Sequence, residues 1–209
     1  MTKPKSLTPA LLRKAEAHLG RCDRVMAKLI HTHGPCTLNR HSFDLFHTLV
    51  VSIISQQLSA KASDTIERRV AECIPYPFNA GDMICVAPGR LRAAGLSSRK
   101  VVYIQGLAAW VNDGRRSYED LASKADDEVV ATLMGIPGIG RWTAEMFLIF
   151  GLRRPDVLAL GDAGLQRAAR MLYPRADSNG KALEKVSERW KPFRSVASWY
   201  LWRHIDGGA

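Results

Sequence analysis

The chain of 209 residues has the length of one large domain or two small ones, which excludes an assembly of many modules. Thirty lysines and arginines against twenty acidic residues give a net charge of +10, and 46% hydrophobic residues exclude a disordered basic tail. A globular protein with this positive field attracts polyanions, so nucleic acid is the first candidate partner.

The cysteines and the apolar stretches indicate the compartment. The four cysteines form no C-x-x-C pair, and the first residues lack the apolar stretch of a secretion signal. We expect a reducing, intracellular environment. The longest stretch without a charged residue, 45–60, is too short and too polar for a membrane helix, which needs about 20 mostly apolar residues. No membrane partner is expected.

Helical periodicity and capping residues run through the whole chain. The first expected helix begins after Thr8 and Pro9, an N-cap and N1 pair, and ends at Gly20. Ser59, Ser97 or Ser98, and Asp162 are further candidate caps. In chain order the expected helices span 10–19, 21–31, 43–55, 60–72, 80–86, 89–94, 99–112, 125–133, 142–150, 163–172, 181–190 and 193–204.

No alternating strand pattern of useful length appears, so we expect an all-α protein of about ten short helices. The two ends of the chain look like one helical bundle and the middle like another. We therefore predict a two-lobed arrangement, with a terminal lobe of residues 1–40 plus 156–209 and a central lobe of 41–155. The active site would lie in the cleft between the lobes.

The most informative segment is 133–144, LMGIPGIGRWTA, in which two expected helices are joined by a glycine turn. Such a reversal needs positive φ angles that only glycine readily accepts. The N–H groups of Gly138 and Gly140, at the start of the second helix, would suit a phosphate, and Arg141 adds a charge. An ordinary turn between two helices is the alternative.

This segment resembles the helix-hairpin-helix motif, here at about 126–151, which binds one DNA strand through its phosphates without reading bases. The resemblance implies DNA contacts by Gly135, Gly138, Gly140, Arg141 and Thr143. It also implies a structural monovalent cation on the hairpin carbonyls, which here are those of Met134, Ile136 and Ile139.

Asp162 follows Gly140 by 22 residues, in the segment LALGDAGL. At a helix start it has a simple reading as an N-cap. However, a hairpin, one helix, a loop with Pro155 and then this aspartate is an order that resembles the HhH-GPD superfamily of DNA base-excision glycosylases. In that superfamily the aspartate is catalytic, so the resemblance implies this role for Asp162.

Other segments extend the resemblance over roughly residues 40–205. The segment 52–62, SIISQQLSAKA, resembles the one that fills the gap left by a flipped base; Gln57 takes the wedge position and Leu58 follows, and either could insert. A capped helix junction is the alternative. The segment 95–100, GLSSRK, resembles the family's Gly-x-Ser-x-x-Lys turn. The segment 189–195, RWKPFRS, with 199–202 is similar to the C-terminal helix of the AlkA type, 3-methyladenine-DNA glycosylase II. We expect a compact form of that type without the N-terminal β domain.

The resemblance also indicates to which members of the superfamily the chain is similar. Members that act as lyases carry a lysine two residues after the last hairpin glycine, where this chain has Trp142. Without that amine no Schiff base forms, so we expect hydrolysis alone. Members with an iron–sulfur cluster have four cysteines near the C-terminus, whereas the last cysteine here is Cys85. No cluster and no required cofactor are expected.

The pocket residues follow from the charge of the reaction. A carboxylate such as Asp162 stabilises the oxocarbenium-like sugar, and an alkylated base, already cationic, leaves without a second acid. Trp142 and Trp202 match aromatic pocket positions of the AlkA type, with core packing as the alternative. Met146 stands where that relative has tyrosine. Glu145, one helical turn from Trp142, could approach the pocket, but we interpret it as an exposed helix glutamate.

The expected function is that of a monofunctional glycosylase, acting as a monomer on 3-methyladenine and 7-methylguanine in damaged double-stranded DNA after base flipping. It would work in the cytoplasm, at the nucleoid, of a bacterium or in the nucleus of a eukaryote. A glycosylase for deaminated or oxidised bases and a non-catalytic helix-hairpin-helix protein are the alternatives.

Overall fold

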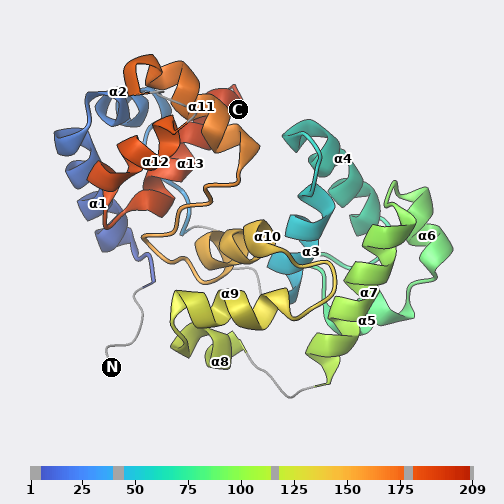
Figure 1. Ribbon diagram of the computed structural model, residues 1–209. Helices are drawn as coiled ribbons and strands as arrows, with labels where there is room; N and C mark the ends of the chain where they lie inside the picture. Colours follow the sequence, from blue (N-terminus) through green and yellow to red (C-terminus); the bar gives the residue numbers. More distant parts are fainter. Residues whose placement is uncertain (1–5, 40–44, 114–117, 177–180, 208–209) are drawn as a thin grey trace. The chain divides into compact units, whose positions relative to one another are not determined.

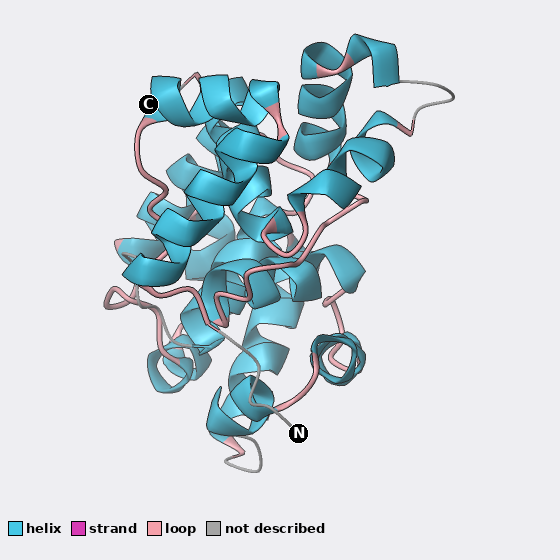
Figure 2. Ribbon diagram, turned by 90° about the vertical axis from the view of Figure 1, so that its left-hand side faces the viewer, coloured by secondary structure: helices cyan, strands magenta, loops and turns pink. Residues whose placement is uncertain are grey.

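The computed structural model describes residues 6–39, 45–113, 118–176 and 181–207. Within these ranges the regular structure is entirely helical, which confirms the expected fold class (Figures 1 and 2). No helix in them is long and apolar enough to cross a membrane. The α-helices are α1 (Pro9–Cys22), α2 (Arg24–His33), α3 (Leu45–Ser55), α4 (Ala60–Ala71), α5 (Ala80–Cys85), α6 (Pro88–Ala93), α7 (Ser98–Asn112), α8 (Tyr118–Ser123), α9 (Asp126–Met134), α10 (Arg141–Met146), α11 (Ala163–Leu172), α12 (Ala182–Ser187) and α13 (Arg194–Ile205).

The predicted caps set the starts of several helices. The side chains of Thr8, Ser59 and Ser97 accept hydrogen bonds from backbone N–H groups three residues further on, at 3.2, 3.4 and 3.2 Å. Each bond satisfies one of the N–H groups that lack a partner inside the helix. These starts were predictable because a cap acts within one turn of chain.

The predicted end of the first helix at Gly20 was wrong. Helix α1 continues through Gly20 to Cys22, and Asp23 then caps α2 by accepting the N–H of Val25 at 2.8 Å. A glycine inside a helix costs only about 1 kcal/mol, which a buried face can offset. Two other differences are small. Helix α8 had no expected counterpart, and residues 43 and 44 of the expected helix 43–55 lie outside the described residues.

Backbone contacts divide the chain into two compact units, each described here by itself. The unit of Phe43–Gly151 contains α3 to α10 (Figure 1). Its centre is α3, which packs against α4, α7 and α10. Nearly every side chain of α3 is buried, as expected of a helix that is apolar all round.

The second unit combines Lys5–Ser42 with Leu152–Ala209 and contains α1, α2, α11, α12 and α13. Helix α13 packs against α1, α2 and α11. Beside it the buried carboxylate of Asp23 accepts hydrogen bonds from the Tyr173 hydroxyl at 2.9 Å and from Trp190 Nε1 at 3.0 Å. These bonds join the start of the chain to its end.

The helix expected over 142–150 is not α-helical throughout. Helix α10 passes at Phe147 into a π-helix, Phe147–Gly151. A Cβ on Gly151 would lie 2.6 Å from the Phe147 ring, so the last residue of the π-helix has to be a glycine unless that ring moves. A π-helical turn is rare and is frequently found at functional sites.

Candidate active site

The glycine hairpin lies between α9 and α10. Gly138 has a φ of +88°, and a Cβ there would lie 2.2 Å from Cγ of Tyr103, in α7. Gly138 therefore has both a conformational and a packing reason to be glycine. Gly140, the N-cap of α10, has an ordinary φ of −93°, and nothing lies within 4 Å of its would-be Cβ. The fold itself does not require glycine at this position.

The start of α10 presents backbone N–H groups at the hairpin. The helix begins its own hydrogen bonding with Ala144 N–H, which donates to the Gly140 carbonyl at 3.0 Å, so the N–H groups before Ala144 point out of the helix end. The Arg141 side chain beside them is exposed. This arrangement suits a phosphate, as the sequence predicted.

The Thr143 side chain does not fit its predicted DNA contact. It is 1% exposed, and its hydroxyl accepts a hydrogen bond of 2.9 Å from Gln56 Nε2. The hydroxyl is therefore committed inside the unit, because α10 packs this face against α3. Only the backbone of Thr143 remains for DNA.

The three hairpin carbonyls fit the donor set of a hard monovalent cation. Met134 ends α9, so its carbonyl belongs to the last turn, which a helix leaves without internal partners. The Ile136 carbonyl accepts the N–H of Ile139 at 3.1 Å, and its second lone pair suits a ligand role.

The predicted wedge is a turn after α3. Gln57 has a φ of +58°, in the left-handed region that glycine favours, and both Gln57 and Leu58 are exposed. Leu58 is one of several large apolar residues with an exposed side chain, at 39% exposure. An exposed apolar side chain on a strained turn suits insertion into a base stack.

Asp162 has the cap role that the sequence offered as one reading, and its catalytic role stays a prediction. It caps α11, since its Oδ1 accepts the Leu165 N–H at 2.7 Å. The same oxygen accepts the indole Nε1–H of Trp202 at 3.0 Å. The residue is only 8% exposed. Two donors fix the orientation of this carboxylate, which is what a group facing a developing positive charge requires.

Gly164 lets α13 approach this carboxylate. A Cβ on Gly164 would lie 3.0 Å from Cδ1 of Ile205 and 3.1 Å from Asp162 Oδ1. Both Ile205 and Trp202 belong to α13. The small residue after Asp162 therefore makes room for the bond between Asp162 and Trp202.

The residues predicted to contact the base belong to different units. Asp162 and Trp202 belong to the unit that holds the chain ends, and Trp142 and Met146 belong to Phe43–Gly151. Trp142 and Trp202 are half-buried, whereas Met146 is buried. The role of these side chains as walls for the base stays a prediction, and Trp202 has gained a second role through its N–H.

The interpretation of Glu145 as an exposed glutamate was wrong. The residue is 9% exposed, and its Oε1 lies 3.7 Å from Nη1 of Arg141, one turn earlier. Its side chain is therefore largely covered, and not on a solvated face of α10. Periodicity within a six-residue helix could not assign this face.

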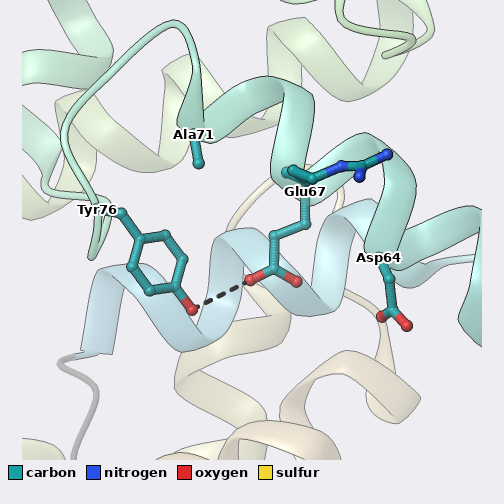
Figure 3. Close-up of a pocket in the computed structure, with 5 residues that line it drawn as sticks. Asp64, Glu67, Ala71 and Tyr76 are labelled. Carbon is teal, nitrogen blue, oxygen red and sulfur yellow. Dashed lines mark hydrogen bonds between the residues drawn. The ribbon is translucent and has the colours of Figure 1, made fainter.

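A separate pocket on α4 has an acidic lining. Asp64, Glu67, Arg68, Ala71 and Tyr76 line it, and the Tyr76 hydroxyl donates to Glu67 Oε1 at 3.3 Å (Figure 3). Burial raises the pKa of Glu67 above its ordinary value. Two carboxylates in so open a pocket do not suit a phosphate, so this pocket is not part of the candidate site.

Sequence reasoning missed the part played by Gln56, Lys100 and Tyr103. All three contact the wedge turn or the hairpin. Gln56 and Lys100 lie in the segments 52–62 and 95–100, which carry the family resemblance, but such a resemblance does not show what a side chain contacts. Tyr103 gave no signal, because it lies off the apolar face of α7.

The comparisons with known proteins give the family of the chain. The model of the HhH-GPD superfamily of base excision DNA repair proteins matches residues 50–192, and the chain belongs to this family. DNA-3-methyladenine glycosylase 1 of Schizosaccharomyces pombe is 33% identical over 202 residues, which cover 92% of this chain and 87% of the relative.

Solved structures give the same family. A complex of S. pombe 3-methyladenine DNA glycosylase with abasic DNA matches with a TM-score of 0.82 at 30% identity, over 92% of this chain and 97% of that one. A DNA-3-methyladenine glycosidase from Bacillus halodurans matches with a TM-score of 0.71 at 35% identity, over 94% and 88% of the two chains.

Proposed function

We propose that this protein is a monofunctional DNA glycosylase that releases 3-methyladenine and 7-methylguanine from double-stranded DNA. The observation that carries the proposal is the oriented carboxylate of Asp162 on the fold of a DNA repair family. The relatives in fission yeast and B. halodurans, whose names state action on 3-methyladenine, support the substrate class.

Asp162 would act on the sugar. As the bond from C1′ to the base nitrogen breaks, its electron pair leaves with the base and positive charge develops on C1′ and the ring oxygen. The carboxylate stabilises that charge. It also orients a water molecule, which adds its oxygen to C1′ and gives a proton to the carboxylate. The bonds from Trp202 and from the Leu165 N–H hold the carboxylate in place for both steps.

The leaving group explains why one carboxylate is enough. A purine methylated on a ring nitrogen is cationic, and it becomes neutral when it takes the electron pair of the broken bond. No acid is needed to protonate it. The ring faces of Trp142 and Trp202 would favour the cationic base over a normal one, by about 0.5–2 kcal/mol for each aromatic contact.

Trp142 supports the absence of lyase chemistry. It occupies the position of the lysine nucleophile in bifunctional members, and an indole cannot form a Schiff base with C1′. Treatment with borohydride during turnover should therefore trap no covalent complex of protein and DNA. A trapped complex would contradict the monofunctional assignment.

The hairpin would hold the DNA backbone. Gly138, Gly140 and the exposed Arg141 would supply backbone N–H groups and one positive charge for phosphates beside the damaged nucleotide. The N–H of Gly135, also predicted to contact DNA, already donates to the Leu133 carbonyl, so Gly135 would contribute only by its small size. A monovalent cation on the carbonyls of Met134, Ile136 and Ile139 would add positive charge there. The enzyme would act as a monomer where the genome lies, at the bacterial nucleoid or in the nucleus.

The decisive experiment compares base release from methylated DNA by the wild type and Asp162→Asn. We expect the variant to lose release of both methylated purines while its affinity for DNA persists, since Asn keeps the cap but not the charge. Asp64→Asn is the control, because it removes the same charge from an exposed position of α4. Full activity of Asp162→Asn would refute the assignment.

The same assay separates the other functions. Duplexes that each contain one defined lesion, alkylated, deaminated or oxidised, show which base is released. Release of deaminated or oxidised bases alone would contradict the proposed substrate. Binding without release from any of them would leave a non-catalytic helix-hairpin-helix protein.

A further inference from the structure

The turn that carries the wedge is held in a strained conformation. After α3 ends at Ser55, Gln57 adopts a φ of +58°, and Leu58 N–H returns to the Ser55 carbonyl at 3.1 Å. A residue other than glycine in this region persists only where its surroundings fix it. The contacts that fix the turn therefore decide where Gln57 and Leu58 stand.

Lys100 donates hydrogen bonds to the end of α3. Its Nζ donates to the carbonyl of Ile54 at 2.7 Å and to that of Gln56 at 2.9 Å, on either side of Ser55. These carbonyls are left without partners where a helix ends, and a cation is favourable there. Lys100 is itself held in the first turn of α7, whose N-cap Ser97 accepts the Lys100 N–H at 3.2 Å. Burial lowers the pKa of Lys100.

Gln56 ties the same turn to the hairpin. Its Nε2 donates one hydrogen bond to the Gly138 carbonyl and another to Thr143 Oγ1, both at 2.9 Å. Both amide hydrogens are therefore used, one on the hairpin turn and one on the first turn of α10. Neither acceptor is among the three carbonyls assigned to a cation.

These contacts form one chain of hydrogen bonds from α7, through the wedge turn, to the hairpin, all within one unit. The hairpin is where DNA phosphates would be held, and the wedge is where the base stack would be entered. The hydrogen bonds between the hairpin and the wedge would therefore fix the distance from the bound phosphate to the inserted side chain.

Resting on the proposed function, we infer that Gln56 and Lys100 are positioning residues for base flipping, which hold the Gln57–Leu58 wedge in register with the hairpin. They do not touch the base or the sugar. They act through the wedge, so their loss slows flipping rather than the breaking of the glycosidic bond or the binding of undamaged DNA.

The test uses Gln56→Met and Lys100→Met, which keep much of the length of the side chain but remove the donors. Lys100→Arg retains donors for the same carbonyls. Gln105→Met is the matched control, because Gln105 Nε2 makes a bond of the same kind and length, 2.9 Å to the Val86 carbonyl, elsewhere in this unit. Thermal unfolding and affinity for undamaged duplex are measured for every variant.

Single-turnover release of 3-methyladenine is then measured on two substrates. In the first the lesion is paired in a duplex; in the second it lies opposite an abasic site, where flipping costs less. We expect Gln56→Met and Lys100→Met to be slower by about tenfold on the paired lesion and near the wild-type rate on the second substrate. Lys100→Arg should recover most of the rate, and Gln105→Met should match the wild type on both.

A wedge variant completes the design. If Gln56 acts through the wedge, combining Gln56→Met with Leu58→Ala and Gln57→Ala should cost little more than removing the wedge alone. An equal loss on both substrates, or fully additive losses, would overturn the inference, because the defect would then lie outside flipping. Failure of the proposed function looks different, since the wild type would release no alkylated base from either substrate.

Discussion

The indole N–H of Trp202 and the carboxylate of Asp162 form a hydrogen bond of 3.0 Å between α13 and the cap of α11. The tryptophan that the sequence suggested as a wall for the base therefore also holds the proposed catalytic group. The ring face and the N–H of Trp202 therefore have different predicted functions, which a substitution can separate.

Replacing Trp202 by phenylalanine tests that separation. Trp202→Phe keeps an aromatic face but removes the donor, and a hydrogen bond to a charged group contributes about 1.5–3 kcal/mol. We expect the single-turnover rate of base release to fall by about 10- to 100-fold. Trp199→Phe, one turn earlier on α13, is the control, since that ring packs edge-on against Tyr200. An unchanged rate in Trp202→Phe would show that the bond is dispensable.

Gly164 offers a second way to disturb the same pair. The methyl group of Gly164→Ala would lie 3.1 Å from Asp162 Oδ1 and 3.5 Å from Cδ1 of Trp202, so we expect a slower reaction with only a small loss of stability. Gly161→Ala is the matched control, because nothing lies within 4 Å of its would-be Cβ. Excision rates and melting temperatures of both variants check this, and equal rates would contradict it.

The hairpin glycines should divide into a structural and a binding position. Gly138→Ala combines a φ of +88° with a clash against Tyr103, so we expect it to cost about 2–4 kcal/mol and to lower the melting temperature by roughly 5–15 °C. Gly140→Ala has space and an ordinary φ, so it should melt like the wild type yet bind DNA more weakly, because its methyl group faces the phosphate. Normal DNA affinity in Gly140→Ala would remove Gly140 from the interface.

Asp23 should matter for stability and not for chemistry. Asp23→Ala removes the acceptor for Tyr173, Trp190 and the first turn of α2, which we expect to cost about 3–5 kcal/mol. Tyr173→Phe removes one donor and should cost about 1 kcal/mol. Denaturant unfolding gives both values. Folded Asp23→Ala should keep its excision rate at low temperature, and a specific loss of rate would indicate a role in the site.

We expect His33 to make the stability of the folded protein decrease at acidic pH. Burial, with His204 and Arg203 adding to it, lowers the pKa of His33 below its ordinary value of about 6.5. As the pH falls below about 6.5, His33 takes up a proton in the unfolded chain before it does so in the folded protein. The contribution of His33 to the free energy of unfolding is therefore full above about pH 6.5 and declines as the pH falls toward the lower pKa of the folded state. His33→Gln should melt with a shallower dependence on pH between 7 and 5. The exposed His31→Gln is the control, and identical slopes in all three proteins would contradict the prediction.

The sequence by itself determined most of the helices, several of their caps and the glycine hairpin, because these depend on residues within one or two turns of each other. The family followed from the order of several separate motifs along the chain. Helix ends were less certain where a local signal was weak, as at Gly20, and the π-helical turn after Met146 left no mark in the periodicity.

The tertiary structure alone decided which side chains work together. Asp162 and Trp202 are 40 residues apart, and Gln56 is 82 residues from Gly138. The burial of Thr143 and Glu145 likewise follows from where α10 packs. Such pairings arise from the packing of whole helices, which brings distant side chains together, and no local pattern of polar and apolar residues encodes that.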